Sequence, residues 1–182
     1  MSVVLHEKIQ DVREELVFKT AVDMAGLFSE PPIDPLFFFG IYGLRVEDYD
    51  FIDSQNIEAV TIAHADGYIT LVNPMFREKF PRRYRATLAH ELGHIVLGHF
   101  SMFSGQEQPG DFPEDTKKIL EREAWEFAGE LLVPGFMLKR EKTLDLKKLT
   151  DTFQVTKSTM EWRLQKNGLI FSDFPEENFW EK

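Results

Sequence analysis

Cysteine is absent from the sequence of 182 residues. Disulfide bonds and thiolate metal sites are therefore excluded, and any metal ion must be held by histidine and carboxylate side chains. Long apolar runs are also missing. No stretch approaches the length of a membrane span, and the first residues lack a basic head followed by an apolar segment. We therefore expect a cytoplasmic protein.

Basic residues are in the minority, with 21 lysines and arginines against 31 acidic residues and a formal net charge of -10. An acidic chain has little non-specific affinity for a phosphate backbone, so direct nucleic-acid binding is not expected. The acidity fits ordinary solubility and, equally, a site that attracts a basic substrate. The length suits one domain over residues 1–182, large enough to bury a full core without disulfides.

Histidine is scarce as well, and three of the five histidines fall within residues 84–100. Apolar residues recur in this segment at spacings of three and four, which predicts an amphipathic helix ending near Gly98. The apolar positions are Leu88, Leu92, Ile95, Val96 and Phe100, and the helix is predicted to carry all three histidines, which are His90, His94 and His99.

This segment contains the pattern H-E-x-x-H at His90, Glu91 and His94. Residues four apart on a helix lie one above the other, so both imidazoles can reach one metal ion. Neutral imidazole nitrogen is a ready ligand for zinc. Glu91 lies about 100° round the helix from His90, where it can touch a water on the metal and act as general base. The pattern predicts a catalytic zinc site.

Other helices are predicted on either side of this segment. Residues 6–25 carry an apolar stripe that predicts an N-terminal helix, ended by the prolines at 29–35. Residues 114–132 begin with acidic residues, continue with an apolar stripe and stop before Pro-Gly, which predicts a second strong helix. Glycine, proline and serine in residues 101–113 predict a loop beside the active site.

A small antiparallel sheet is predicted between the N-terminal helix and the H-E-x-x-H helix. Alternation suggests a short strand near residues 44–47, and two β-branched runs at 59–65 and 68–73 flank Asp66-Gly67, a dipeptide that favours a two-residue hairpin turn. His64 lies in the first arm of the hairpin, and we expect it to be packed or solvated.

Catalytic zinc sites use three protein ligands and leave one position open. The helix predicted over 114–132 should supply the third ligand, and the candidates within it are Glu121, Glu123, Glu126 and Glu130. On helical spacing, Glu121 shares a broad face with the alanines and leucines and faces the core, whereas Glu123 points away.

Two segments together resemble the ImmA/IrrE metallopeptidases, which are zincins of the gluzincin type. The first is Arg85-Ala-Thr-Leu-Ala-His-Glu-Leu-Gly-His, and the second is Glu121-Arg-Glu-Ala-Trp-Glu-Phe-Ala-Gly-Glu-Leu-Leu-Val-Pro, which is similar to the family pattern E-x-x-A-x-x-F-A-x-x-L-L-x-P. The resemblance implies an α+β, zincin-like domain with a small antiparallel sheet, an H-E-x-x-H helix, a glutamate-ligand helix and a C-terminal helix-turn-helix-like module.

The resemblance also implies roles for individual residues. Zinc would be bound by His90, His94 and Glu121, with Glu91 as the catalytic base. Trp125 departs from the family pattern, since relatives usually carry a small polar residue there, often Asn or Asp. If that side chain supports a ligand by a hydrogen bond, this chain has lost the support. Zinc would be the only cofactor.

Residues 144–170 have the form helix, tight turn near 154–156, helix. Their basic surplus is weak, because five basic residues face three acidic ones. We interpret the segment as a packing module within the peptidase domain, and DNA binding as the alternative. The aromatic, acidic tail at 171–182 is expected to dock on the domain.

The leading hypothesis is a zinc endopeptidase of narrow specificity. By resemblance, its substrate would be a helix-turn-helix transcriptional repressor, whose cleavage derepresses genes of a mobile element or a stress response. His99, Tyr68 and Tyr84 are unranked candidates for stabilising the oxyanion. A non-proteolytic alternative is a zinc-binding partner, or a toxin-antitoxin component, that sequesters a repressor. A third hypothesis is a DNA-binding regulator that uses residues 144–170. No membrane partner is expected.

Overall fold

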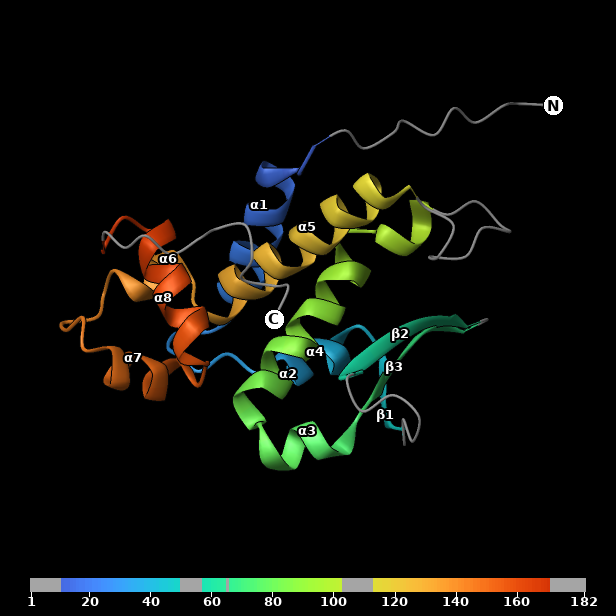
Figure 1. Cartoon of the computed structure of the whole chain (residues 1–182), viewed down its shortest axis with the longest axis horizontal. Coiled ribbons are helices and arrows are strands. Elements are labelled where there is room, and N and C mark those ends of the chain that lie inside the picture. The colour runs from blue at the N-terminus through green and yellow to red at the C-terminus, as the bar shows by residue number, and fades with distance from the viewer. Residues whose placement is uncertain (1–10, 50–56, 65, 103–112, 171–182) are drawn as a thin grey trace.

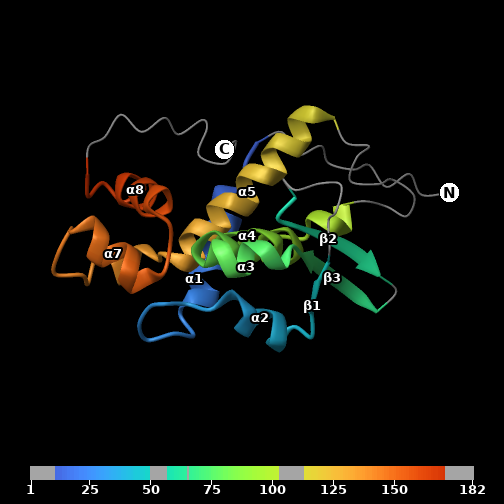
Figure 2. The same cartoon turned by 60° about the horizontal axis from the view of Figure 1, so that its bottom comes forward.

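The computed structural model describes residues 11–49, 57–64, 66–102 and 113–170. A three-stranded sheet lies at one end, α6, α7 and α8 lie at the other, and α4 and α5 cross between them (Figures 1 and 2). The elements are α1 Glu14–Ala25, α2 Pro35–Ile41, β1 Arg45–Asp48, β2 Ala59–His64, β3 Gly67–Val72, α3 Pro74–Lys79, α4 Pro81–Val96, the 3-10 helix η1 His99–Met102, α5 Glu114–Leu132, α6 Gly135–Leu138, α7 Leu146–Phe153 and α8 Lys157–Lys166. No described helix is both long and apolar enough to cross a membrane.

Helix α4 carries the H-E-x-x-H pattern and begins at Pro81, where the missing amide hydrogen of proline costs nothing. It ends at Val96, followed by Gly98 with a φ of +75°. The prediction that the chain turns near Gly98 is confirmed, because glycine adopts this left-handed conformation without strain. The prediction that His99 belongs to the same helix is wrong. His99 follows the turn and begins η1.

Helix α5 has the bounds predicted from the sequence, with Glu114 and Asp115 in its first turn. Acidic side chains there complement the positive end of the helix dipole. Its apolar face packs against α4, and α1 packs against α5 as well. Helix α1 begins at Glu14, and residues 11–13 are not helical. The predicted helix is therefore wrong over residues 11–13, and its predicted start at residue 6 lies outside the described residues.

The sheet has the strand order β1-β3-β2. The predicted hairpin is confirmed, since β2 and β3 pair in antiparallel register with Thr61 opposite Thr70. Strand β1 runs parallel to β3, so the sheet is mixed and the expected purely antiparallel arrangement is wrong. Gly67, predicted in the turn, is instead the first residue of β3, where it pairs with His64. The side chain of His64 is half-exposed at this end of the hairpin.

The C-terminal module packs into the core through α7 and α8. Leu149, Phe153, Val155, Met160 and Leu164 join the main cluster of buried apolar residues. A left-handed residue and a threonine cap separate the two helices at 154–156. One of the basic residues weighed for DNA binding, Arg163, is only 5% exposed. It forms an ion pair with the buried Glu130 and donates to the carbonyl oxygen of Val133. The predicted docking of residues 171–182 lies outside the described residues.

Four arginines of α3 and of the first turns of α4 make contacts within the fold. Arg77 pairs with Asp48, Arg82 with Asp151, and Arg83 with Glu58, while Arg85 donates to the backbone carbonyls of Ile33 and Gln154. These contacts tie α3 and α4 to the sheet and to the C-terminal module.

Candidate metal centre

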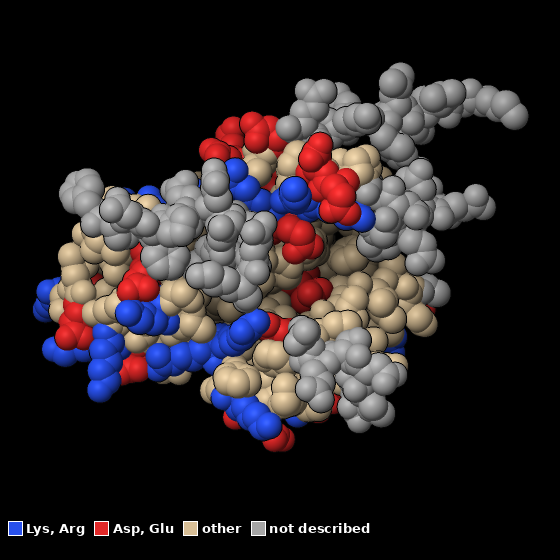
Figure 3. Space-filling view, in the orientation of Figure 1, with Lys and Arg blue, Asp and Glu red and all other residues tan. Residues whose placement is uncertain are grey.

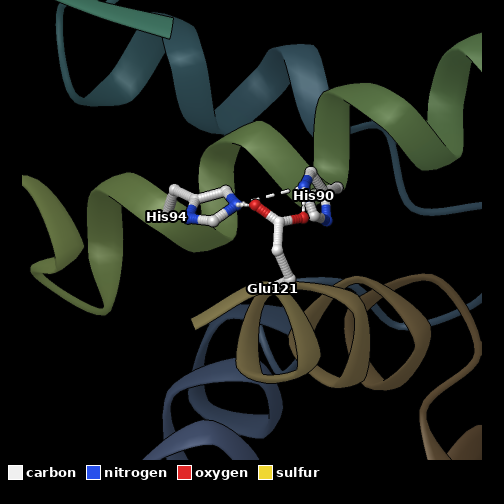
Figure 4. Close-up of side chains that lie close together, drawn as sticks. All are labelled: His90, His94 and Glu121. Atoms are coloured by element: carbon white, nitrogen blue, oxygen red, sulfur yellow. Dashed lines mark hydrogen bonds and ion pairs between the residues drawn. The ribbon is translucent and has the colours of Figure 1, made fainter. Parts of the chain in front are cut away.

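Two histidines of α4 and one glutamate of α5 converge at the crossing of these helices (Figure 4). The Nε2 atoms of His90 and His94 lie 3.1 Å apart. The carboxylate of Glu121 faces the Nε2 atoms of both rings. Its Oε2 lies 3.3 Å from Nε2 of His90, and its Oε1 lies 3.4 Å from Nε2 of His94. Helical spacing placed Glu121 on the core face, and the resemblance implied it as the third ligand. The fold brings this glutamate of α5 to the two histidines.

The spacing of these atoms fits a metal ion. Ligand atoms about 2.0–2.1 Å from a tetrahedral zinc lie about 3.3–3.5 Å from one another, close to the three separations found. His90 is buried, whereas the side chain of Glu121 is 52% exposed, so the cluster is reached from solvent. Burial opposes ionisation of Glu121, but the two imidazoles outweigh it and hold the pKa of its carboxyl well below the ordinary value. The donor set is therefore two imidazole nitrogens and a carboxylate.

Glu91 lies beside the cluster on α4 and is 9% exposed. Its Oε2 accepts a hydrogen bond of 2.6 Å from the hydroxyl of Thr61 on β2. The Thr61 oxygen is 2.9 Å from that of Thr70 on β3. Since the Thr61 hydrogen is donated to Glu91, Thr70 must be the donor to Thr61. The hairpin thus fixes one oxygen of this carboxylate.

Residues 77–165 match the Peptidase M78 family model, described as the IrrE N-terminal-like domain. The match includes the H-E-x-x-H segment and the glutamate segment of α5, the two helices that build the cluster. Residues 77–165 therefore belong to the ImmA/IrrE family. The His-His-Glu cluster lies within this peptidase-family region, and the resemblance noted in the sequence is confirmed.

The chain also resembles a Mycobacterium tuberculosis transcriptional regulator of known structure. The TM-score is 0.61 at 17% sequence identity, and the match covers 91% of this chain and 49% of the other. Likeness at this identity shows the fold alone, and this chain spans about half the length of that protein. It agrees with the predicted α+β class. A search of curated proteins finds no match.

A second set of polar side chains lies behind His94. Nδ1 of His99 is 2.8 Å from Nδ1 of His94, and Nε2 of His99 is 3.0 Å from Oε2 of Glu123. Glu123 also accepts hydrogen bonds from the backbone N–H and the guanidinium of Arg13, which precedes α1. The prediction that Glu123 points away is wrong, because its side chain is fully buried between α5, η1 and Arg13.

Burial and hydrogen bonding shift the pKa values in this set. Burial disfavours the imidazolium and lowers the pKa of His99 to about 4, although Glu123 acts in the opposite direction. Burial also opposes ionisation of Glu123, but hydrogen bonds from His99 and Arg13 outweigh it and lower the pKa of Glu123 to about 2. At neutral pH the pair is a neutral imidazole beside a carboxylate.

His90 has no comparable support. Its ring lies against the indole of Trp125, with centroids 4.3 Å apart. Nδ1 of His90 is buried and makes no hydrogen bond within the described part of the chain. When Nε2 faces a metal, Nδ1 carries the hydrogen and requires an acceptor, whereas an indole offers only a donor. The predicted consequence of Trp125, loss of a hydrogen-bonding partner for a ligand, agrees with this geometry.

The three oxyanion candidates occupy different environments. His99 is engaged at both ring nitrogens, as described above. Tyr84 is buried near the start of α4, where burial raises its pKa and Arg77 acts in the opposite direction. Tyr68 lies on β3 with its ring 5.1 Å from that of Phe100, which is 6.2 Å from the ring of His94. Of the two tyrosines, Tyr68 is therefore the one whose ring is linked to that of His94, through the ring of Phe100.

The surface over this region is hollowed between α5 and the strands, and acidic side chains line part of the hollow (Figure 3). Such a concave, acidic surface can receive a segment of another chain, and a basic one would be attracted to it.

Proposed function

We propose that this protein is a zinc-dependent endopeptidase of narrow specificity. The observation that carries the proposal is the arrangement of His90, His94 and Glu121 at the edge lengths of a tetrahedral zinc site, with Glu91 beside them. A structural zinc site would be closed by four protein ligands, whereas three ligands leave a position open for chemistry.

The proposed mechanism assigns one role to each side chain. His90, His94 and Glu121 hold the metal. When bound, zinc would lower the pKa of water and polarise the scissile carbonyl. Glu91 accepts the proton of the attacking water and passes it to the leaving amine. The hydrogen bond from Thr61 occupies one oxygen of Glu91, so the other oxygen is available for this transfer.

Strand β2 is a suitable surface for the substrate. It is the outer strand next to β3, and no other described strand pairs with its free edge. An extended peptide can add to such an edge through backbone hydrogen bonds. Because Thr61 of β2 contacts Glu91, a peptide bound there would run close to the catalytic carboxylate.

A helix-turn-helix repressor is the proposed substrate, and the family resemblance supports this choice. The core packing of α7 and α8 supports the view that residues 1–182 form one peptidase domain, in which the C-terminal module is structural. A repressor substrate and the absence of cysteine agree with a cytoplasmic location.

The test is mass spectrometry of the helix-turn-helix repressor encoded nearest this gene, after incubation with the zinc-loaded protein or its Glu91→Gln variant. One cut that requires Glu91 is expected. Elemental analysis tests the metal site in parallel, since Glu121→Gln should lose zinc and Glu126→Gln should retain it. Glu126 is a matched control because it lies on the same helix and pairs with Arg122 and Lys166. Equal cleavage by wild type and Glu91→Gln would contradict the proposal.

The second candidate is a zinc-binding protein that sequesters a repressor without cutting it. The incomplete support of His90 beside Trp125 favours it, because ligand support affects activity as well as affinity. A stable complex with the repressor, unchanged by Glu91→Gln and without cleavage products, would establish this function in place of the first.

A further inference from the structure

The two histidines of the H-E-x-x-H pattern are supported unequally. Nδ1 of His94 contacts His99, whereas Nδ1 of His90 has no hydrogen-bond partner among the described residues. Both histidines present Nε2 to Glu121. Binding through Nε2 requires that nitrogen to be unprotonated, so the hydrogen of each neutral ring must be on Nδ1. For His94, the side chains that contact Nδ1 determine whether this nitrogen carries the hydrogen.

The contacts behind His94 determine the direction of the hydrogen bonds. Nε2 of His99 lies 3.0 Å from a carboxylate oxygen of Glu123, so this nitrogen must be the donor. A neutral His99 then has a lone pair at Nδ1, which can only accept from Nδ1–H of His94 across 2.8 Å. The reverse direction would place the lone pair of His99 against the carboxylate, and the hydrogen of His94 on the nitrogen that faces the metal site.

Glu123 is held in the charged form that this direction requires. Its carboxylate accepts from the backbone N–H of Arg13 at 2.6 Å and from Nε and Nη2 of the same residue. Its side chain is 0% exposed, so water does not compete for these bonds. Charge-assisted hydrogen bonds of this kind are short and strong, so they hold the carboxylate in place.

We propose that His99 and Glu123 are positioning residues that select the metal-binding tautomer of His94. Glu123 orients His99, His99 accepts from Nδ1–H of His94, and Nε2 of His94 is thereby left free for the metal. This inference rests on the proposed zinc site and adds two residues to it, neither of which touches the metal or the substrate.

Zinc affinity of the full chain, measured by competition with a chromophoric chelator, tests this role. His99→Phe and Glu123→Gln should each weaken zinc binding by about 10- to 100-fold. His99→Gln should lose less than His99→Phe, because its carbonyl oxygen can still accept from His94. The matched controls are His64→Phe and Glu126→Gln, which alter the same residue types away from the cluster and should bind zinc as wild type does.

The outcomes separate the two proposals. If wild type binds no zinc, the zinc site itself is refuted. If wild type binds zinc and both His99→Phe and Glu123→Gln bind it equally well, the site stands and the positioning role is overturned.

The tautomers of the histidine rings can also be measured in the wild-type protein. This test does not depend on whether a variant folds. Long-range proton–nitrogen correlation spectra of the histidine rings in the metal-free protein at neutral pH report which nitrogen carries the hydrogen. The expected result is a protonated Nδ1 on His94 and a protonated Nε2 on His99. A hydrogen on Nδ1 of His99 would mean that the hydrogen bonds run in the opposite direction, and this result would overturn the inference.

Discussion

Gly93 offers a sharp test of how closely the metal centre depends on the crossing of α4 and α5. It lies between His90 and His94 in the sequence, at the point where α4 meets α5. A Cβ at this position would be 2.9 Å from Cδ1 of Phe127 and 3.2 Å from the Cα and carbonyl oxygen of Ala124. The Phe127 side chain is fully buried and the Ala124 atoms belong to the backbone, so neither can move aside freely.

The required movement can be compared with the tolerance of a metal site. Carbon atoms in contact prefer about 3.5–4.0 Å, so Gly93→Ala must separate the helices locally by about 0.3–0.6 Å. Metal–ligand distances tolerate about 0.2 Å. Overpacking of this kind costs about 1–3 kcal/mol. If metal binding requires the native spacing of α4 and α5, this strain reduces the free energy of zinc binding by the same amount. The dissociation constant for zinc should then rise about 5- to 150-fold.

The stability of the metal-free Gly93→Ala protein should change much less than its zinc affinity. Helix propensity favours alanine over glycine by about 1 kcal/mol and offsets part of the overpacking. Zinc affinity by chelator competition and urea denaturation of the metal-free protein measure the two effects separately.

Gly129→Ala is the matched control on α5. Its Cβ would lie 2.0 Å from Cζ3 of Trp162, on the side of α8, so stability should fall while zinc affinity is retained. Zinc binding by Gly93→Ala with wild-type affinity would refute the reasoning. An equal loss of affinity in Gly129→Ala would show that general destabilisation is the cause.

Two further predictions concern buried charges. Glu130→Gln leaves the cation of Arg163 buried without its carboxylate, and this should lower the free energy of unfolding by about 3–5 kcal/mol, measured by urea denaturation. The control is Glu161→Gln, which removes a more exposed helical ion pair and should lower the free energy of unfolding by less than about 1 kcal/mol. Equal effects of the two substitutions would contradict the prediction. The metal-free protein should lose stability as the pH falls, because the native pKa values of His99, about 4, and Glu123, about 2, lie below their ordinary values of 6.5 and 4.5, so the unfolded state binds protons first. The window runs from about pH 6.5 to 4 for His99 and from about pH 4.5 to 2 for Glu123, with at most about 3 kcal/mol from each and less than their sum because the two groups interact. Urea denaturation at pH 7, 5.5 and 4 measures this change, and constant stability over that range would contradict the assigned burial of His99.

The sequence predicted well the features that depend on neighbours along the chain. The bounds of α5 followed from its acidic start, its apolar period and the proline after it. The turn at Gly98 followed from glycine chemistry, and the hairpin from its two β-branched runs. The pairing of His90 with His94 also followed from the chain alone, since a helix places residues four apart on one side.

Features that depend on contacts between distant segments were predicted poorly. Strand β1 pairs with β3 in parallel, a direction that alternation along one strand does not encode. Glu123 was assigned to the outside because helical spacing describes one helix at a time. Its burial is due to Arg13 and His99, which reach it from a different part of the chain. His99 was placed in the helix and considered for the oxyanion, whereas the turn at Gly98 directs it beneath His94.

The sequence by itself determined that two imidazoles and a neighbouring carboxylate share a helix, because the helical repeat is a local property of the backbone. Only the tertiary structure decided which histidine nitrogen has an acceptor and how closely the two helices approach at Gly93. These outcomes depend on the crossing of α4 and α5, which is set by side-chain packing across the whole core and cannot be read from the period of either helix.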